Sequence, residues 1–319
     1  MSAEGSKKAI IAALSANAGI AAAKFVGFGI TGSSSMLAEA VHSVADTANQ
    51  GLLLVGQRRS ARQADRLHPF GYGRDRYFYS FVVALVIFAL GSLFAIYEGI
   101  NKIRHPHHLE SAVVAIVILL VAICLESYSF ATAFRESKPL KGDASWWGFI
   151  RNSRSPELPV VLLEDTGALL GLVFALGGVG LTVLTDDPIW DGIGTLAIGI
   201  LLGVIATILI IEMKSLLIGE GVTDADEATV IHALGGAAGI DRVIHLKTQY
   251  LGPEELLVAA KVAVAPNSSA RDIAVAIDGA EAALRARIPS ARVIYLEPDI
   301  DRSADDRPGT VDEPAPRGS

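Results

Sequence analysis

Cysteine is almost absent from this sequence, which contains a single one, Cys124, inside a long apolar segment. A lone cysteine excludes a disulfide within the chain, a thiolate metal cluster and redox chemistry between paired thiols. Charged residues are also scarce, at 19 % of the chain. The sequence has no Walker motif, glycine-rich nucleotide loop, nucleophile elbow or His-Glu-x-x-His motif. We therefore expect no ATP hydrolysis and no enzymatic activity from this chain.

Apolar residues dominate what is present, at 51 % of the chain, and the mean hydropathy is +0.44. A membrane-spanning helix needs about 20 consecutive apolar residues. Six segments qualify and predict an α-helical membrane protein with six transmembrane helices: 10–30, 36–56, 77–97, 111–134, 159–184 and 190–211. The first segment is too long, and lacks the cleavage site, for a removed signal peptide.

Positive charge in the loops predicts the orientation. Six arginines lie between the second and third segments and five Lys or Arg residues between the fourth and fifth, whereas the opposite loops hold only Lys102 and Arg104. Both termini are therefore predicted to face the cytoplasm. The abundance of Ala, Gly and Arg suggests a bacterial source and a location in the inner, or cell, membrane.

The composition changes after the sixth segment, which predicts three regions. Residues 1–217 form the transmembrane domain, 218–300 a small cytoplasmic domain and 301–319 a disordered tail. Capping signals and apolar patterns predict helices at 223–234 and 269–287 and strands at 242–251, 256–265 and 292–296. The order αββαβ indicates a ferredoxin-like α+β sheet with its helices on one face. A domain this small gains stability by dimerising, so we expect a homodimer.

The second apolar segment carries a polar stripe of Glu39, His42, Asp46 and Asn49, whose spacings of three, four and three residues place them on one helical face. An ionisable group at that depth costs roughly 2.5–3.5 kcal/mol on insertion scales, so it needs a partner, a cation or water. An imidazole and a carboxylate one turn apart suit a divalent metal ion.

The fifth segment adds two carboxylates, Glu164 and Asp165. Adjacent residues on a helix point about 100° apart, so only one of them can face the stripe squarely. The other then faces a neighbouring helix or the cytoplasmic vestibule.

Residues 33–46, with the core Leu-Ala-Glu-Ala-Val-His-Ser-Val-Ala-Asp, resemble the second span of the cation diffusion facilitator family, and His-Pro-Phe-Gly-Tyr-Gly-Arg at 68–74 resembles its second signature. Members of that family are dimeric antiporters that exchange zinc, iron, cobalt or manganese for protons. The resemblance implies a tetrahedral site built from the second and fifth spans.

The resemblance assigns ligand roles to His42, Asp46 and Asp165. The histidine that the family has in the fifth span is replaced by Val161, in a Leu-Glu-Asp variant of the pattern. The remaining ligand is then Glu164, Glu39 or water, and these alternatives stay open. For Glu39 two interpretations are equally possible, a proton relay or a pair with a neighbouring helix.

Peripheral metal sites are less complete. The family's loop site corresponds to Asp65, His68 and Tyr72, so one histidine is missing and His68 either binds a cation weakly or hydrogen-bonds the loop. In the C-terminal domain, His245 and Glu297 remain, but Ile244 and Tyr295 replace ligands. The outer-loop histidines collect released metal weakly or form a solvated turn: His105, His107 and His108.

The resulting hypothesis is efflux of a divalent cation, with Zn²⁺ first and Mn²⁺, Fe²⁺ or Co²⁺ as alternatives, by exchange for protons. Metal and proton would compete for His42, whose unperturbed pKa is about 6.5. No cofactor and no nucleic-acid partner are expected. The alternatives are a partner subunit that transports nothing, an exporter that prefers Mn²⁺ or Fe²⁺, and a membrane metalloenzyme.

Overall fold

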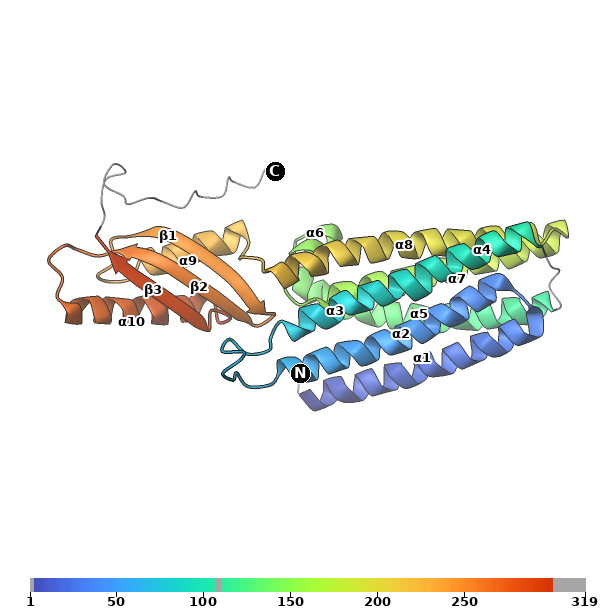
Figure 1. Ribbon diagram of the computed structural model, residues 1–319, viewed down its shortest axis with the longest axis horizontal. Helices are drawn as coiled ribbons and strands as arrows, with labels where there is room; N and C mark the ends of the chain where they lie inside the picture. Colours follow the sequence, from blue (N-terminus) through green and yellow to red (C-terminus); the bar gives the residue numbers. More distant parts are fainter. Residues whose placement is uncertain (1–2, 107–110, 301–319) are drawn as a thin grey trace. The chain divides into compact units, whose positions relative to one another are not determined.

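The computed structural model describes residues 3–106 and 111–300, with side chains from residue 17 onward except that of residue 140. The chain divides into two compact units, and the boundary along the sequence lies between Gly219 and Glu220 (Figure 1). The predicted tail at 301–319 and two of the outer-loop histidines, His107 and His108, lie outside the described residues.

The first unit is a bundle of long helices that run side by side (Figure 1). Helices α3, η1 and α4 form one continuous rod, of which η1 is a wider π-helical stretch. The elements are α1 (Ala3–Thr31), α2 (Ser34–Ser60), α3 (Asp75–Val86), η1 (Ile87–Leu93), α4 (Phe94–Arg104), α5 (Ala112–Lys141), α6 (Trp146–Asn152), α7 (Glu157–Thr185) and α8 (Ile189–Ile218).

Four of the six predicted spans are long and apolar enough to cross a membrane: Asp75–Arg104, Ala112–Pro139, Glu157–Thr185 and Ile189–Ile218. The other two are also long helices, α1 with 29 residues and α2 with 27. Helix α2 falls short of this apolar standard. For α2 the reason is its polar stripe, since its buried face carries hydroxyl, amide and ionisable side chains.

The second unit has the element order αββαβ, which confirms the predicted order. It consists of α9 (Asp224–Gly235), β1 (Arg242–Gly252), β2 (Glu255–Ala263), α10 (Ala270–Arg287) and β3 (Val293–Asp299). The side chains of Thr223 and Ser269 cap the two helices, as their sequence signals indicate. These caps explain why the helix starts were predictable to within one residue.

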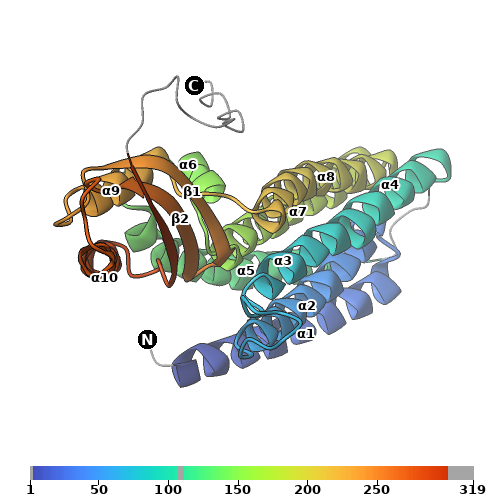
Figure 2. The same cartoon turned by 60° about the vertical axis from the view of Figure 1, so that its left-hand side comes forward.

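The sheet of this unit has the order β1-β2-β3, with β1 antiparallel and β3 parallel to the central β2. Alternate residues of β2, Val258, Ala260 and Val262, face the apolar sides of α9 and α10. Both helices therefore cover the same face of the sheet (Figure 2). None of the helices described within residues 220–300 lies on the opposite face.

A seam of close backbone contact joins α4 to α8. A Cβ atom on Gly99 would lie 2.7 Å from the backbone nitrogen of Leu196, and one on Gly199 would lie 2.7 Å from the backbone nitrogen of Ile96. Such distances leave no room for any side chain, so glycine is required at both positions. Small residues let helices approach closely where lipid provides no hydrophobic drive for association.

A buried carboxylate, Asp191 at the start of α8, holds the first turn of α2. Its Oδ1 accepts hydrogen bonds from Ser33 Oγ at 2.9 Å and from the backbone N–H of Ser35 at 3.3 Å. Its Oδ2 accepts from the backbone N–H and the hydroxyl of Ser34, at 2.9 and 3.1 Å. Asp191 thus satisfies amides that the helix itself leaves without partners.

The loop between α2 and α3 is organised around Asp65. Its Oδ1 accepts from the backbone N–H groups of Leu67 and His68, at 2.9 and 2.8 Å, and its Oδ2 accepts from the Tyr72 hydroxyl at 2.5 Å. These hydrogen bonds, with that of Tyr72 the largest contribution, lower the pKa of Asp65 to about 2. The Arg62 guanidinium lies 4.5 Å from the centre of the Tyr72 ring, which completes an exposed but well-connected turn.

Replacing Asp191 with alanine should destabilise the bundle. The change leaves buried backbone and hydroxyl donors without an acceptor, which costs about 2–4 kcal/mol. The measurement is the unfolding temperature of the purified protein in detergent, with Asp143→Ala as the control because Asp143 is exposed in a loop. Equal unfolding temperatures for Asp191→Ala and the wild type would contradict a stabilising role of the Asp191 hydrogen bonds.

Replacing Tyr72 with phenylalanine should raise the pKa of Asp65 from about 2 toward its ordinary value of about 3.9. A carboxyl with a depressed pKa stabilises the fold above its ordinary pKa and loses that contribution as the pH falls toward 2. NMR titration of ¹³C-labelled aspartate carboxyls measures the shift. Tyr295→Phe, on the C-terminal sheet, is the control and should leave the titration of Asp65 unchanged.

Candidate functional site

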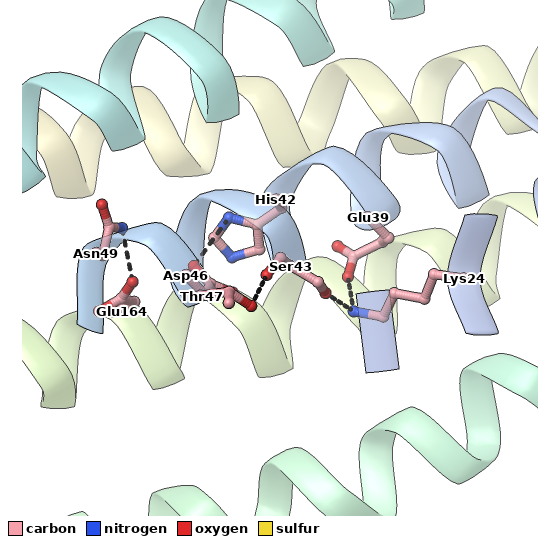
Figure 3. Close-up of polar contacts among 8 residues, drawn as sticks. All are labelled: Lys24, Glu39, His42, Ser43, Asp46, Thr47, Asn49 and Glu164. Carbon is pink, nitrogen blue, oxygen red and sulfur yellow. Dashed lines mark hydrogen bonds and ion pairs between the residues drawn. The ribbon is translucent and has the colours of Figure 1, made fainter. Parts of the chain in front are cut away.

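The polar stripe of α2 is buried inside the first unit. Glu39, His42, Asp46 and Asn49 are all 5 % exposed or less, so none of them faces the outside of the bundle. Figure 3 shows them following one another along α2. The Nδ1 of His42 lies 3.5 Å from Oδ1 of Asp46, one turn further along the helix. This contact is the imidazole–carboxylate pair expected from the spacing.

Glu164 is the carboxylate of α7 that faces this stripe. Its Oε1 accepts a hydrogen bond of 2.8 Å from the side-chain amide of Asn49 (Figure 3). Its carboxyl group also lies near enough to that of Asp46 for the two to interact electrostatically. Two carboxyl groups from different helices thus meet beside His42.

Asp165 faces a different helix. Its Oδ2 accepts a hydrogen bond of 3.2 Å from the hydroxyl of Ser129 on α5. Val161, one turn earlier on α7, packs in an apolar cluster with Phe130 of α5 and Trp146 of α6. The position at which the family carries its histidine therefore points, like Asp165, toward α5 and away from the α2 stripe.

Several polar atoms along α2 are buried and make no hydrogen bond with any residue that the structure describes. Such atoms are costly in a protein interior unless water or an ion satisfies them. They are Oε1 of Glu39, Nδ1 and Nε2 of His42, Oδ1 of Asp46, Oδ1 of Asn49 and Oε1 of Gln50. Their succession along one helix marks a polar path through an apolar bundle.

The predicted ligands do not yet converge on one point. Within residues 3–106 and 111–300, no group of three His, Cys, Asp or Glu side chains has the spacing needed to hold a metal ion. His42, Asp46 and Glu164 lie near one another, while Asp165 accepts its hydrogen bond from Ser129 of α5. A cation bound here would have to draw these side chains together.

The structure adds three neighbours that the sequence analysis missed. Lys24 of α1 is buried and contacts Glu39, and Glu126 of α5 is buried and interacts electrostatically with His42 and Asp46. Gly91, in the π-helical stretch, lies beside His42, since a Cβ there would be 3.9 Å from its Nδ1. A charged residue in the middle of an apolar span is a signal that could have identified Lys24 and Glu126.

The peripheral candidates lie apart from the stripe. Asp65 and His68 belong to the α2–α3 loop, where the carboxylate accepts hydrogen bonds from Tyr72 and two backbone amides. The Nδ1 of His68 lies 3.4 Å from Oδ1 of Asp65. On the open face of the C-terminal sheet, His245 and Glu297 flank Lys261 in register. The Lys261 ammonium lies 3.0 Å from Glu297 and 3.3 Å from Asp299, so these carboxylates already hold a cation.

That open face is hollowed into a cavity of about 410 Å³ whose lining includes His245, Lys261 and Tyr295. The neighbouring carboxylates of Glu297 and Asp299 raise the pKa of Lys261. The protonated ammonium therefore disfavours a metal cation at this position.

Comparison with known proteins finds similarity over most of this chain. The model of the cation efflux transmembrane domain matches residues 10–218. The proton-coupled zinc antiporter SLC30A9, mitochondrial, of Mus musculus is 34 % identical over 242 residues, which cover 75 % of this chain and 42 % of that protein. Metal tolerance protein C4 of Arabidopsis thaliana is 32 % identical over 261 residues, covering 81 % and 57 %. This chain thus spans about half the length of these two relatives.

A more distant relative matches over a greater length. The magnetosome protein MamM of Magnetospirillum gryphiswaldense is 23 % identical over 309 residues, which cover 91 % of this chain and 87 % of that protein. A solved MamM C-terminal domain aligns with 25 % of this chain at 20 % identity and a TM-score of 0.24. The family model covers the helical bundle that contains the buried stripe, and the chain therefore belongs to the cation efflux family, the cation diffusion facilitators.

Proposed function

We propose that this protein exports a divalent metal cation, Zn²⁺ in the first instance, in exchange for protons. The observation that carries the proposal is the line of buried, unsatisfied polar atoms on α2 that includes both nitrogens of His42 and Oδ1 of Asp46. A lone pair on an imidazole nitrogen and a carboxylate oxygen are the donors that Zn²⁺ prefers. The names of the SLC30A9 relatives support the choice of zinc and of protons as the exchanged ion.

The ligands in this proposal come from two helices. Helix α2 supplies His42 and Asp46. Helix α7 supplies Glu164, because the carboxyl group of Glu164 already lies near that of Asp46. Asp165 is the second candidate on α7 and would reach the ion only after exchanging its hydrogen bond with Ser129. Water completes a three-ligand site, as it does in open zinc sites.

Proton exchange follows from the same ligands. A metal ion needs a neutral imidazole and ionised carboxylates, so each cation that binds displaces protons from the site. Reloading with protons then favours release of the metal. Glu39 stays a candidate proton relay, although its contact with Lys24 supports the alternative of a pair between helices.

The architecture that we propose for this activity has six membrane-spanning helices and both termini in the cytoplasm of a cell whose inner membrane holds the protein. Residues 1–217 form the transmembrane domain, and 218–300 form a cytoplasmic domain that joins two copies into a homodimer. The length of α1 and α2, 29 and 27 residues, supports two spans beyond the four apolar ones.

Replacing His42 with alanine should abolish metal flux. The change removes the nitrogen ligand from a site with few protein ligands, and we expect the initial rate to fall by about 100-fold or more. The measurement is Zn²⁺ and Mn²⁺ uptake into proteoliposomes under an imposed pH gradient. His232→Ala is the matched control, because His232 lies in α9 of the second unit, where its ring contacts Arg287.

The outcomes separate the alternatives. Zn²⁺ flux that depends on the gradient and on His42 supports the antiporter, whereas a preference for Mn²⁺ or Fe²⁺ would attribute the Val161 substitution to a change in selectivity. No flux of any metal from correctly folded wild-type protein would contradict transport and favour the partner subunit.

A second pair of variants tests which α7 carboxylate binds the ion. Glu164→Gln should weaken Zn²⁺ binding by about tenfold or more, since it removes a ligand charge, while Asp165→Asn should have a smaller effect because Asp165 faces Ser129. Equilibrium dialysis of the purified variants measures the dissociation constants. A larger loss in Asp165→Asn would show that α7 turns when the cation binds.

A further inference from the structure

Lys24 is a buried cation next to the proposed cation path. Its side chain is 1 % exposed, and its ammonium lies 3.0 Å from Oε2 of Glu39 and donates a hydrogen bond of 2.8 Å to the hydroxyl of Ser43. Figure 3 shows the ammonium reaching from α1 to these two groups on α2. A lysine held inside an apolar bundle is costly unless its ammonium is paired, as it is here.

The partner of Lys24 is only half satisfied. Oε1 of Glu39 is buried and makes no hydrogen bond to the residues that the structure describes. It occupies space left by a glycine of α7, since a Cβ on Gly171 would lie 2.6 Å from it. The ammonium therefore holds the carboxylate by Oε2, while Oε1 lies against α7.

This pair lies one helical turn from the proposed site. Glu39 precedes His42 by three residues, which is neighbour spacing on a helix. The charged groups that interact with His42 are Glu39, Lys24, Glu164 and Glu126, and Lys24 is the cation of this set. A metal ion held by His42 would thus lie on the same face of α2 as Glu39, about one turn further along the helix.

We infer that Lys24 is a specificity-determining residue, a tethered cation that keeps Glu39 from ligating the transported metal ion. This inference rests on the proposed function. While the ammonium occupies Glu39, the metal ion is held by fewer carboxylates and is released more readily. Without the ammonium, Glu39 supplies an additional charged ligand, which tightens binding and slows release.

A purely structural ion pair predicts something else. Removing one partner of a buried pair is strongly destabilising, whereas replacing both with neutral residues is often tolerated. Such a pair would tie α1 to α2 and would affect the unfolding temperature only. The affinity for metal therefore distinguishes the two roles.

The test is Zn²⁺ binding by equilibrium dialysis and Zn²⁺ flux in proteoliposomes, both with the full chain. Lys24→Met should lower the Zn²⁺ dissociation constant by about tenfold, because ligand charge sets affinity, and should slow turnover. Lys24→Met combined with Glu39→Gln should return the dissociation constant to near the wild-type value. Lys24→Arg keeps the positive charge and serves as the matched control.

An unchanged or weaker affinity in folded Lys24→Met would overturn the inference, as would a double variant that binds as tightly as Lys24→Met. If Lys24→Met unfolds, Lys24→Gln gives the same comparison and keeps a donor for Ser43. His42→Ala separates this inference from the proposed function. If wild-type Zn²⁺ binding does not depend on His42, the proposed function is contradicted. If binding depends on His42 but Lys24 has no effect on affinity, only the inference about Lys24 is contradicted.

Discussion

The rest of the first unit depends on how α2 buries a polar face. An apolar helix face can pack against lipid or protein without specific polar contacts. Each buried amide, imidazole and carboxylate, in contrast, requires a hydrogen-bonding or oppositely charged partner. Two neighbours provide such groups: Lys24 on α1 contacts Glu39, and Glu164 on α7 accepts a hydrogen bond from Asn49. The positions of α1 and α7 around α2 are therefore set by charge and hydrogen bonding as much as by packing.

The N-terminal end of α2 is fixed in a different way. Asp191 accepts hydrogen bonds from the backbone and side chains that open the helix, so α2 is held to α8 at that end. Further along, the stripe carries unsatisfied atoms on His42 and Asp46. A helix that is firmly held at one end and incompletely satisfied in its middle can change its middle contacts without losing its position.

Features that depend on local spacing were predictable from the sequence. The common face of the α2 stripe follows from the helical repeat, and the starts of α9 and α10 follow from the caps at Thr223 and Ser269. Features that depend on how the helices are rotated relative to one another could not be predicted from the sequence. The facing of Glu164 rather than Asp165 toward α2 depends on the rotation of α7, and the pairing of Lys24 depends on the contact between α1 and α2.

The glycine seam between α4 and α8 has a consequence for natural variation in this protein. Because a side chain at Gly99 or Gly199 would overlap the backbone of the opposite helix, substitutions there prevent assembly of the bundle and reduce the amount of protein in the membrane. Substitutions of Glu164 or His42 leave that seam untouched. The seam thus separates substitutions that change the packing of α4 against α8 from substitutions that leave this packing unchanged.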